Sequence, residues 1–193
     1  MAEIRVRLIR AVSALTAPKT GTKVDISEVI FSDHHEHRRM FGILEEIDPK
    51  RTAALGSIWN RLQVLLEVHA RPEELYFSPR LLTLQQDQFE QKSPEDETED
   101  AIHDHNEIRD AISGASGKDV GMDSWLRAVA DVNEVNSDHK AEEDRQGLTD
   151  FRRHVSREER HTIAVDFCAF EAEHAAGIEA HDEGPEQYVK SNE

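Results

Sequence analysis

The chain has 193 residues and a mass of 22.0 kDa, enough for one domain with a sizeable core. Its 40 acidic and 23 basic residues leave a net charge of −17, which repels phosphate backbones and anionic membranes and argues against nucleic-acid binding. The sequence has neither a run of about 18 apolar residues nor the apolar core of a signal peptide, so we expect a cytoplasmic protein. The single cysteine excludes an intrachain disulfide, whereas eleven histidines in so acidic a chain raise the question of metal binding.

Helix signals begin at the N-terminus and continue along the first half of the chain. Residues 1–23 form an extension whose apolar residues fit a short amphipathic helix. Asp25 is a typical helix cap, and apolar residues recur at helical spacing over Ile26–Leu44. Asp48-Pro49 predicts the start of the next helix, because proline is favoured at the first helical position, and the apolar stripe continues over Leu55–Leu66.

The second half of the chain begins with a polar segment, Gln85–Gln91, that we expect to be a loop. Ser93-Pro94 predicts the start of a third helix, with acidic residues in its first turn. The glycines between Gly114 and Gly121 are expected to end that helix, and Asp123 or Ser124 begins a fourth.

A fifth helix is expected to follow the capping box that opens at Ser156 and to include Ile178 on its apolar face. Gly184-Pro185 is expected to end it and to leave a loose tail. The pattern therefore predicts an all-α fold, in which an up-down-up-down four-helix bundle over residues 24–153 follows the extension 1–23. Residues 154–193 are expected to add the C-terminal helix and tail.

Four histidines are nearly evenly spaced along these helices. His34, His69, His105 and His139 are 35, 36 and 34 residues apart, and each lies on the apolar stripe of its own helix. The midpoints between successive histidines fall at or near the three expected turns. In antiparallel helices, residues equidistant from a turn lie at the same height, so the four imidazoles are expected to meet at one level of the bundle.

Two of these histidines belong to H-x3-E motifs, His69 with Glu73 and His139 with Glu143. On an α-helix, residues four apart differ by about 40° in direction, so each helix can offer an imidazole and a carboxylate to one site. Four imidazoles and two carboxylates can hold two metal ions and leave open positions for a small ligand.

The other two histidines lie in a repeated D-H-x-E-x-R pattern, at Asp33–Arg38 and at Asp104–Arg109. Arg38 and Arg109 occupy the turn position that Glu73 and Glu143 occupy on their own helices. Arginine cannot ligate a metal, but it can hold a carboxylate or an anionic substrate through paired hydrogen bonds. Surface pairing with acidic residues is an equally good interpretation of both arginines.

Several motifs together resemble the hemerythrin-like HHE cation-binding family over Val24–Phe151. They include LLEVHARPEELYFSP at Leu65–Pro79, DHNEIRDAI at Asp104–Ile112 and HKAEE at His139–Glu143. The resemblance implies a four-helix bundle with two iron ions in a non-haem centre bridged by an oxo or hydroxo group and by carboxylates. The ligands implied are His34, His69, Glu73, His105, His139 and Glu143.

Two positions depart from the pattern of the oxygen-carrying hemerythrins. Those proteins have a second histidine one turn after the ligand of the third helix, where this chain has Arg109. The departure favours a reactive centre over reversible oxygen carriage. Pro72 lies between His69 and Glu73 and removes a backbone donor, so we expect a kink or a bulge beside the site.

Several further residues have more than one interpretation. His37 could be a ligand, a hydrogen-bond donor beside the centre or, as we prefer, a hydrogen-bonded core residue. Glu74 and Asp144 are weaker ligand candidates because a residue at i+5 points about 140° away from the histidine. Tyr76 and Tyr188 could approach the metals, although we expect them to pack or to lie at the surface. His174 is expected to pack, but it could line a pocket if the fifth helix covers the end of the bundle, whereas His35 and His103 are expected to face solvent.

Three functions remain open on the sequence alone. The first is a di-iron protein that binds or reacts with O2, peroxide or NO, with oxidase-like, peroxidase-like or catalase-like activity. The second is a di-iron oxidase or oxygenase acting on a small organic substrate, for which the terminal segments could build a pocket. The third is an iron-storage or iron- and oxygen-sensing module.

Overall fold

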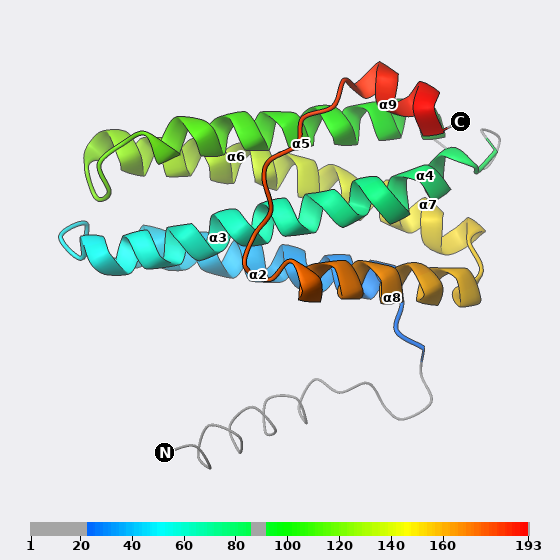
Figure 1. Ribbon diagram of the computed structural model, residues 1–193, viewed down its shortest axis with the longest axis horizontal. Coiled ribbons are helices and arrows are strands. Elements are labelled where there is room, and N and C mark those ends of the chain that lie inside the picture. Colours follow the sequence, from blue (N-terminus) through cyan, green and yellow to red (C-terminus); the bar gives the residue numbers. More distant parts are fainter. Residues whose placement is uncertain (1–22, 86–91, 193) are drawn as a thin grey trace, which may run out of the picture.

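The computed structural model describes residues 23–85 and 92–192, so the expected N-terminal helix and most of the Gln85–Gln91 loop lie outside the described residues. Four long helices lie side by side in Figure 1: α2 (Ile26–Glu46), α3 (Thr52–Pro72), α5 (Pro94–Ser116) and α6 (Asp123–Arg145). The described residues contain no strand, which confirms the all-α fold class. None of the helices in these two ranges is long and apolar enough to cross a membrane.

The caps predicted for α2 and α5 are confirmed. The Asp25 carboxylate accepts a hydrogen bond from the Ser27 amide at 3.1 Å, and Ser93 Oγ accepts one from the Asp96 amide at 3.0 Å. The prediction for the second helix was wrong by three residues, because α3 begins at Thr52. Asp48 instead accepts a hydrogen bond from the Lys50 amide at 3.0 Å and so closes the turn before the helix.

The turn between α5 and α6 depends on a single glycine. Gly114 remains inside α5, whereas Gly117 caps its end. Gly121 has φ +86°, and a Cβ at this position would lie 2.4 Å from the carbonyl oxygen of Pro49. Only glycine fits there, and its absent side chain lets this turn pack against the turn between α2 and α3.

The predicted irregularity at Pro72 is confirmed. Proline has no amide hydrogen, so the α-helical hydrogen-bond ladder cannot continue through it unchanged. α3 ends at Pro72 and is followed by the π-helix η1 (Glu73–Phe77) and by α4 (Ser78–Leu82). The wider turn of η1 begins at the glutamate of the first H-x3-E motif and buries both Glu73 and Glu74. After α6, the chain enters α7 (Gly147–His154).

The C-terminal region differs from the prediction. α8 (Arg157–Glu173) starts at the expected Ser156 cap but ends before Ile178. The expected loose tail is wrong, because Pro185 opens another helix, α9 (Pro185–Asn192), which buries Tyr188 and packs against α5. Figure 1 shows α8 beside α2 and the segment before α9 crossing the bundle.

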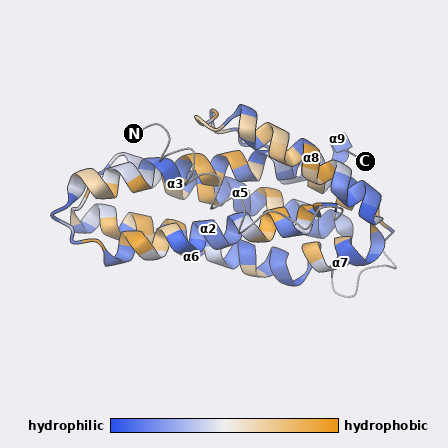
Figure 2. Cartoon of the chain, turned by 90° about the horizontal axis from the view of Figure 1, so that it is seen from below, coloured by the Kyte–Doolittle hydropathy of each residue, from blue (hydrophilic) through white to orange (hydrophobic). Residues whose placement is uncertain are grey.

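Two apolar clusters fill the interior. One gathers around Trp59 and Trp125, and the other around Phe77, Phe151 and Phe167. On α2, His34 lies between Ile30 of the second cluster and Met40 of the first. His69 and His139 likewise lie between first-cluster residues of their own helices and second-cluster residues of the segments that follow, Phe77 and Leu148. Each long helix carries both apolar and polar residues in Figure 2, as expected of helices with one buried face. The site is therefore held between two packed layers of side chains.

Candidate metal centre

The four evenly spaced histidines meet inside the bundle, one from each long helix. The side chains of His34, His69, His105 and His139 are all at least nine-tenths buried. The ring centroids of His34 and His69 are 5.1 Å apart, and those of His105 and His139 are 4.7 Å apart. Burying four imidazoles together is costly unless other groups compensate their polar atoms.

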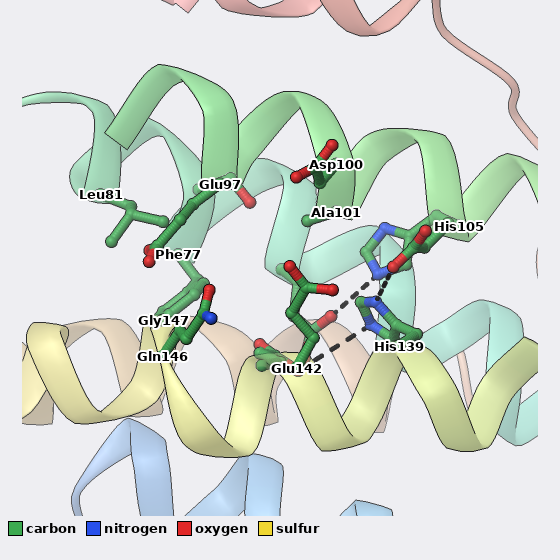
Figure 3. Close-up of a pocket in the computed structure, with 14 residues that line it drawn as sticks. Phe77, Leu81, Glu97, Asp100, Ala101, His105, His139, Glu142, Gln146 and Gly147 are labelled. Atoms are coloured by element: carbon green, nitrogen blue, oxygen red, sulfur yellow. Dashed lines mark hydrogen bonds and ion pairs between the residues drawn. The ribbon is translucent and has the colours of Figure 1, made fainter. Parts of the chain in front are cut away.

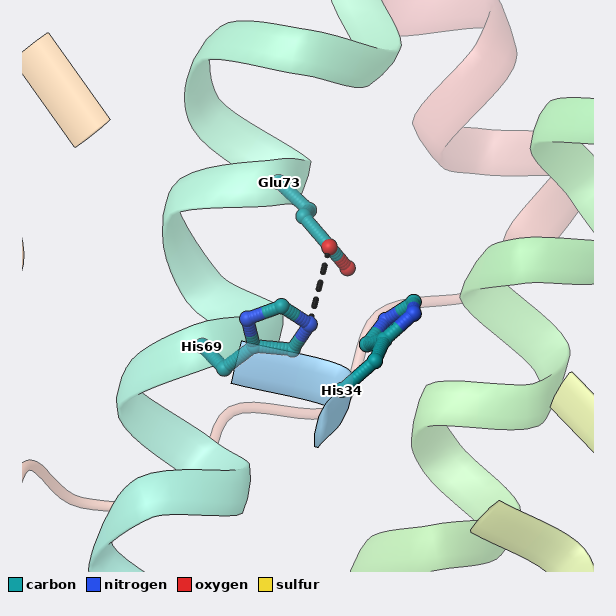
Figure 4. Close-up of side chains that lie close together, drawn as sticks. All are labelled: His34, His69 and Glu73. Carbon is teal, nitrogen blue, oxygen red and sulfur yellow. Dashed lines mark ion pairs between the residues drawn. The ribbon is translucent and has the colours of Figure 1, made fainter. Parts of the chain in front are cut away.

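Glu73 lies between the two pairs of histidines. Its Oε1 is 3.0 Å from Nε2 of His69, as Figure 4 shows, and its Oε2 is 3.2 Å from Nε2 of His105. The position of Glu73 at the start of η1 places this carboxylate between α3 and α5. Ligand atoms from two three-residue groups, His34–His69–Glu73 and Glu73–His105–His139, lie within 4.8 Å of one another in each group. Glu73 therefore belongs to both groups.

Glu143 has the corresponding position on the other side. Its Oε2 is 3.3 Å from Nε2 of His34 and 3.9 Å from Nε2 of His139, which belong to different three-residue groups. Both glutamates of the H-x3-E motifs thus face one histidine of their own helix and one histidine of another helix.

The inner atoms of this cluster lie close to one another, but they form no hydrogen bond of acceptable geometry among the described residues. The buried atoms in question are Nε2 of His34, His69, His105 and His139, Oε1 of Glu73 and Oε2 of Glu143. Such atoms are rare in folded proteins, and each needs an explanation. Imidazole nitrogens and carboxylate oxygens are also the donors that iron, zinc and manganese accept. These six residues therefore fit a two-metal site in which each glutamate could bridge.

The outer atoms of the same imidazoles face carboxylates. Nδ1 of His34 contacts Asp144 at 2.8 Å, and Nδ1 of His105 contacts Glu74 at 3.1 Å. Asp144 and Glu74 therefore approach histidines of other helices by their outer nitrogens, not by the inner nitrogens that face the glutamates.

Carboxylates also face the outer nitrogens of the two H-x3-E histidines. Nδ1 of His139 is hydrogen-bonded to Asp104 at 3.2 Å, whereas Nδ1 of His69 is 3.4 Å from Asp33 without forming a hydrogen bond. A carboxylate hydrogen-bonded to the outer nitrogen fixes the tautomer that leaves Nε2 free for a metal, and this arrangement is usual at histidine metal sites.

The comparison with known families agrees with this geometry. The model of the hemerythrin HHE cation-binding domain matches residues 25–165, which is most of the chain. The chain belongs to the hemerythrin HHE cation-binding domain family. No curated protein and no solved structure matches the chain. Membership of the HHE family, together with the two histidine and glutamate groups, supports cation binding at this place in the bundle.

Arg109 lies buried inside the bundle, close to this centre. Its guanidinium group is buried and donates to Glu67 at 3.0 and 3.1 Å and to Glu74 at 2.7 Å. Glu74 in turn contacts the outer nitrogen of His105. Arg109 thus supports the imidazole of His105 through a carboxylate and leaves the position of a further histidine without a metal-binding side chain.

Arg38 occupies the equivalent position in the first repeat, but its surroundings differ. Its Nη1 is 3.6 Å from Asp144, and 47% of its side chain is exposed. The repeat therefore places both arginines beside the acid that contacts a histidine, one in the interior and one at the surface.

The HHE site attracts positive charge. Burial disfavours charged imidazoles, yet the contacts with Glu73 and Glu74 raise the pKa of His105 to about 9. Burial likewise opposes ionisation of Glu73, but His69 and His105 hold the pKa of its carboxyl well below the usual range. In the metal-free chain these shifts favour protonated imidazoles beside the glutamates. A metal ion that binds to the imidazole nitrogens must therefore displace their protons.

The other sequence candidates lie outside the two groups. His37 is buried with its ring 5.0 Å from that of His69, and its Nδ1 has no hydrogen-bond partner among the described residues. His35 and His103 are exposed, as expected. Tyr76 packs on Phe170.

Two C-terminal residues pack away from the inner nitrogens. His174 stacks on Phe170 with the ring centroids 4.0 Å apart. The hydroxyl of Tyr188 donates to the carbonyl oxygen of Glu74 and thereby joins α9 to η1. The C-terminal segment thus contacts the chain that carries Glu74 without supplying an atom to either group.

Sequence reasoning missed some residues near the centre. Nothing in the motifs pointed to Glu67, the second partner of Arg109, or to Asn136, whose buried Nδ2 has no hydrogen-bond partner among the described residues. Asp33 and Asp104 were visible as part of a repeat, but their contacts with the histidines of the next helix were not. A third group, Asp33, His69 and Glu171, uses the outer face of His69 and includes a residue of α8.

Proposed function

We propose that the HHE centre holds two iron ions and reacts with O2, peroxide or NO. One ion would be held by His34, His69 and Glu73, and the other by His105, His139 and Glu73, with Glu143 as a second bridge. These ligands would be presented by an up-down-up-down bundle over residues 24–153, to which the N-terminal extension and the C-terminal segment are added.

The convergence of six buried atoms without hydrogen-bond partners carries this proposal. The four inner nitrogens come from the four long helices, and the two glutamate oxygens come from η1 and α6. Carboxylates at the outer nitrogens of His34 and His105 orient these imidazoles. A mixed nitrogen and oxygen donor set suits iron, although it also accepts zinc and manganese. Bound iron would supply electrons to a small oxidant or accept them from a reductant.

Space for a small ligand lies on the side of the centre that faces Asn136. A narrow cavity there is lined by the four histidines together with Arg109 and Asn136. The amide of Asn136 is a buried donor without a partner among the described residues, so it can hydrogen-bond an anionic ligand.

Arg109 supports a reactive centre over an oxygen carrier. Arg109 stands where an oxygen carrier has a further histidine, and its guanidinium binds Glu67 and Glu74. The group of His105 and His139 therefore contains two histidines, as does the group of His34 and His69. A metal with fewer protein ligands keeps exchangeable positions, which a reacting molecule needs. We therefore propose that irreversible oxidation, and not reversible oxygen binding, is the property of this chain.

Stopped-flow mixing tests the reactivity. Protein loaded with ferrous iron is expected to become diferric within a single mixing experiment with O2 or hydrogen peroxide, without a long-lived oxygen adduct. A stable adduct that returns to the ferrous state under vacuum would contradict the proposal and indicate oxygen carriage. Repeated turnover of peroxide would agree with the proposal and would indicate that the protein removes peroxide.

An oxidase for a small organic substrate is the second candidate. A pocket with about 40 Å³ of free space, open to solvent, reaches Glu73, His105 and His139 and includes the apolar side chains of Phe77 and Leu81. Its described walls come from η1, α4, α5, α6 and α7, so the C-terminal segment does not build it. Consumption of an added organic substrate in step with O2 would distinguish this candidate from the first.

A further inference from the structure

The pocket beside the centre is lined by more carboxylates than the ligand set requires. Its inner end is formed by Glu73, Glu143, His105 and His139. Its walls add four acids that belong to no ligand group. One is Asp104, the partner of His139, and Figure 3 shows the other three on α5 and α6: Glu97, Asp100 and Glu142. The pocket therefore connects candidate metal ligands with a second set of acidic side chains nearer the mouth.

Glu97 is the unusual member of this set. It is 9% exposed, and its buried Oε2 has no hydrogen-bond partner among the described residues, although it lines the pocket. Burial, together with Asp150, Glu142 and Asp100, raises the pKa of Glu97 to about 7. A buried carboxylate beside other carboxylates costs stability unless a cation compensates it. The surroundings of Glu97 therefore favour the binding of a cation.

Gly147 lines the pocket between Glu97 and Glu143. A Cβ at residue 147 would lie 3.8 Å from Oε2 of Glu97 and 3.8 Å from Cγ of Glu143. Any side chain larger than a methyl group at this position would occupy the space between the unpaired carboxylate and a candidate metal ligand. Glycine leaves that space free.

The mouth of the pocket already binds a cationic group of the chain itself. The ammonium group of Lys92 contacts Asp100 at 2.6 Å and also contacts Glu142. Each of these three side chains is between 33% and 51% exposed, so the ion pairs are accessible to solvent and easily exchanged. A divalent cation arriving from solvent can replace the ammonium group on the two carboxylates.

We propose that this pocket is the access route for divalent cations, which reach Glu73 and Glu143 past the carboxylates of Asp100, Glu142 and Glu97. The proposal rests on the proposed function, because the route must end at a metal centre. In this route Lys92 is the occupant that the cation displaces, and Glu97 is the buried carboxylate that attracts the cation into the pocket. The protein-wide negative charge adds a general attraction, so the route must be tested against it.

Cobalt uptake by metal-free protein tests the route without relying on catalysis. The visible absorption of Co2+ reports the rate after mixing, and metal analysis reports the final content. Glu97→Gln is expected to slow uptake roughly tenfold, in the range by which local charge changes association rates, and to leave the final content unchanged. Lys92→Met is expected to accelerate uptake.

The matched control is Glu95→Gln, which removes the same charge from an exposed position on the same helix. It is expected to leave the rate within about twofold of the wild-type value, because solvent and salt screen an exposed charge. Equal rates of cobalt uptake by Glu97→Gln and wild-type protein would contradict the access route, as would equal slowing in both glutamine variants. Neither result would contradict the metal centre itself. Wild-type protein that takes up no cobalt would overturn the proposed function and the route with it.

Discussion

Replacing Glu73 with alanine is expected to remove both metal ions from the protein. Its two carboxylate oxygens face different histidines, Oε1 toward His69 and Oε2 toward His105, so a single substitution removes a ligand from both groups. Metal content after purification from iron-replete cells should fall from about two ions per chain to well under one. Thermal unfolding should also begin at a lower temperature, because a metal that binds only the folded chain stabilises it.

His103→Ala is the control for this substitution. His103 lies on α5 two residues before His105, but it is exposed, and its Nε2 is 3.3 Å from Glu107. The variant should keep the full metal content and the wild-type unfolding temperature. Equal loss of metal from Glu73→Ala and His103→Ala would contradict the ligand assignment, as would full metal content in Glu73→Ala.

Arg109→Met is expected to cause a large loss of stability while sparing every candidate ligand. The guanidinium is the buried partner of Glu67 and Glu74, which are themselves 8% and 3% exposed. Removing one partner of a buried ion pair costs about 3–5 kcal/mol, because the remaining charge is left without compensation. In a chain of this length each kcal/mol lowers the midpoint of thermal unfolding by roughly 2–4 °C.

Arg38→Met is the matched comparison, because the D-H-x-E-x-R repeat places Arg38 at the equivalent position. Its side chain is half exposed and 3.6 Å from Asp144, so its removal should cost less than about 1 kcal/mol. Calorimetry of both metal-free variants measures the difference. Equal destabilisation by Arg38→Met and Arg109→Met would contradict the argument that burial decides the contribution of each arginine.

The local signals in the sequence predicted much of the bundle. Capping at Asp25, Ser93 and Ser156 depends on side chains within a few residues of each helix start, so the sequence contains the required information. The even spacing of His34, His69, His105 and His139 also predicted which side chains would meet. Helix geometry alone distinguished Glu73 from Glu74, because only the former lies one turn after a histidine.

Contacts between the two halves of the bundle could not be predicted in this way. Glu74 and Asp144 looked like weaker ligands, and their contacts with the outer nitrogens of His105 and His34 join residues far apart in sequence. The same limit applies to Glu67, which contacts Arg109 on another long helix. Tertiary packing determines which of these residues come into contact, and hydrophobic periodicity does not predict those contacts.

The C-terminal helix α9 was missed for a different reason. Gly184-Pro185 was interpreted as a helix stop, yet proline is as well suited to a first helical turn. The burial of Tyr188 and its hydrogen bond to Glu74 favour the helix, and neither is visible from the local sequence. Glu97 was likewise unremarkable in sequence, because its significance depends on a pocket formed by five separate elements.

The metal content of wild-type protein tests the central claim most directly. The protein should be expressed in iron-replete cells, purified without chelators and analysed for iron, zinc and manganese together with its Mössbauer spectrum. Four buried imidazoles and two glutamates around two three-residue groups predict two iron ions per chain with the spectrum of a coupled diferric pair. A single zinc ion per chain, or no metal at all, would contradict the di-iron centre.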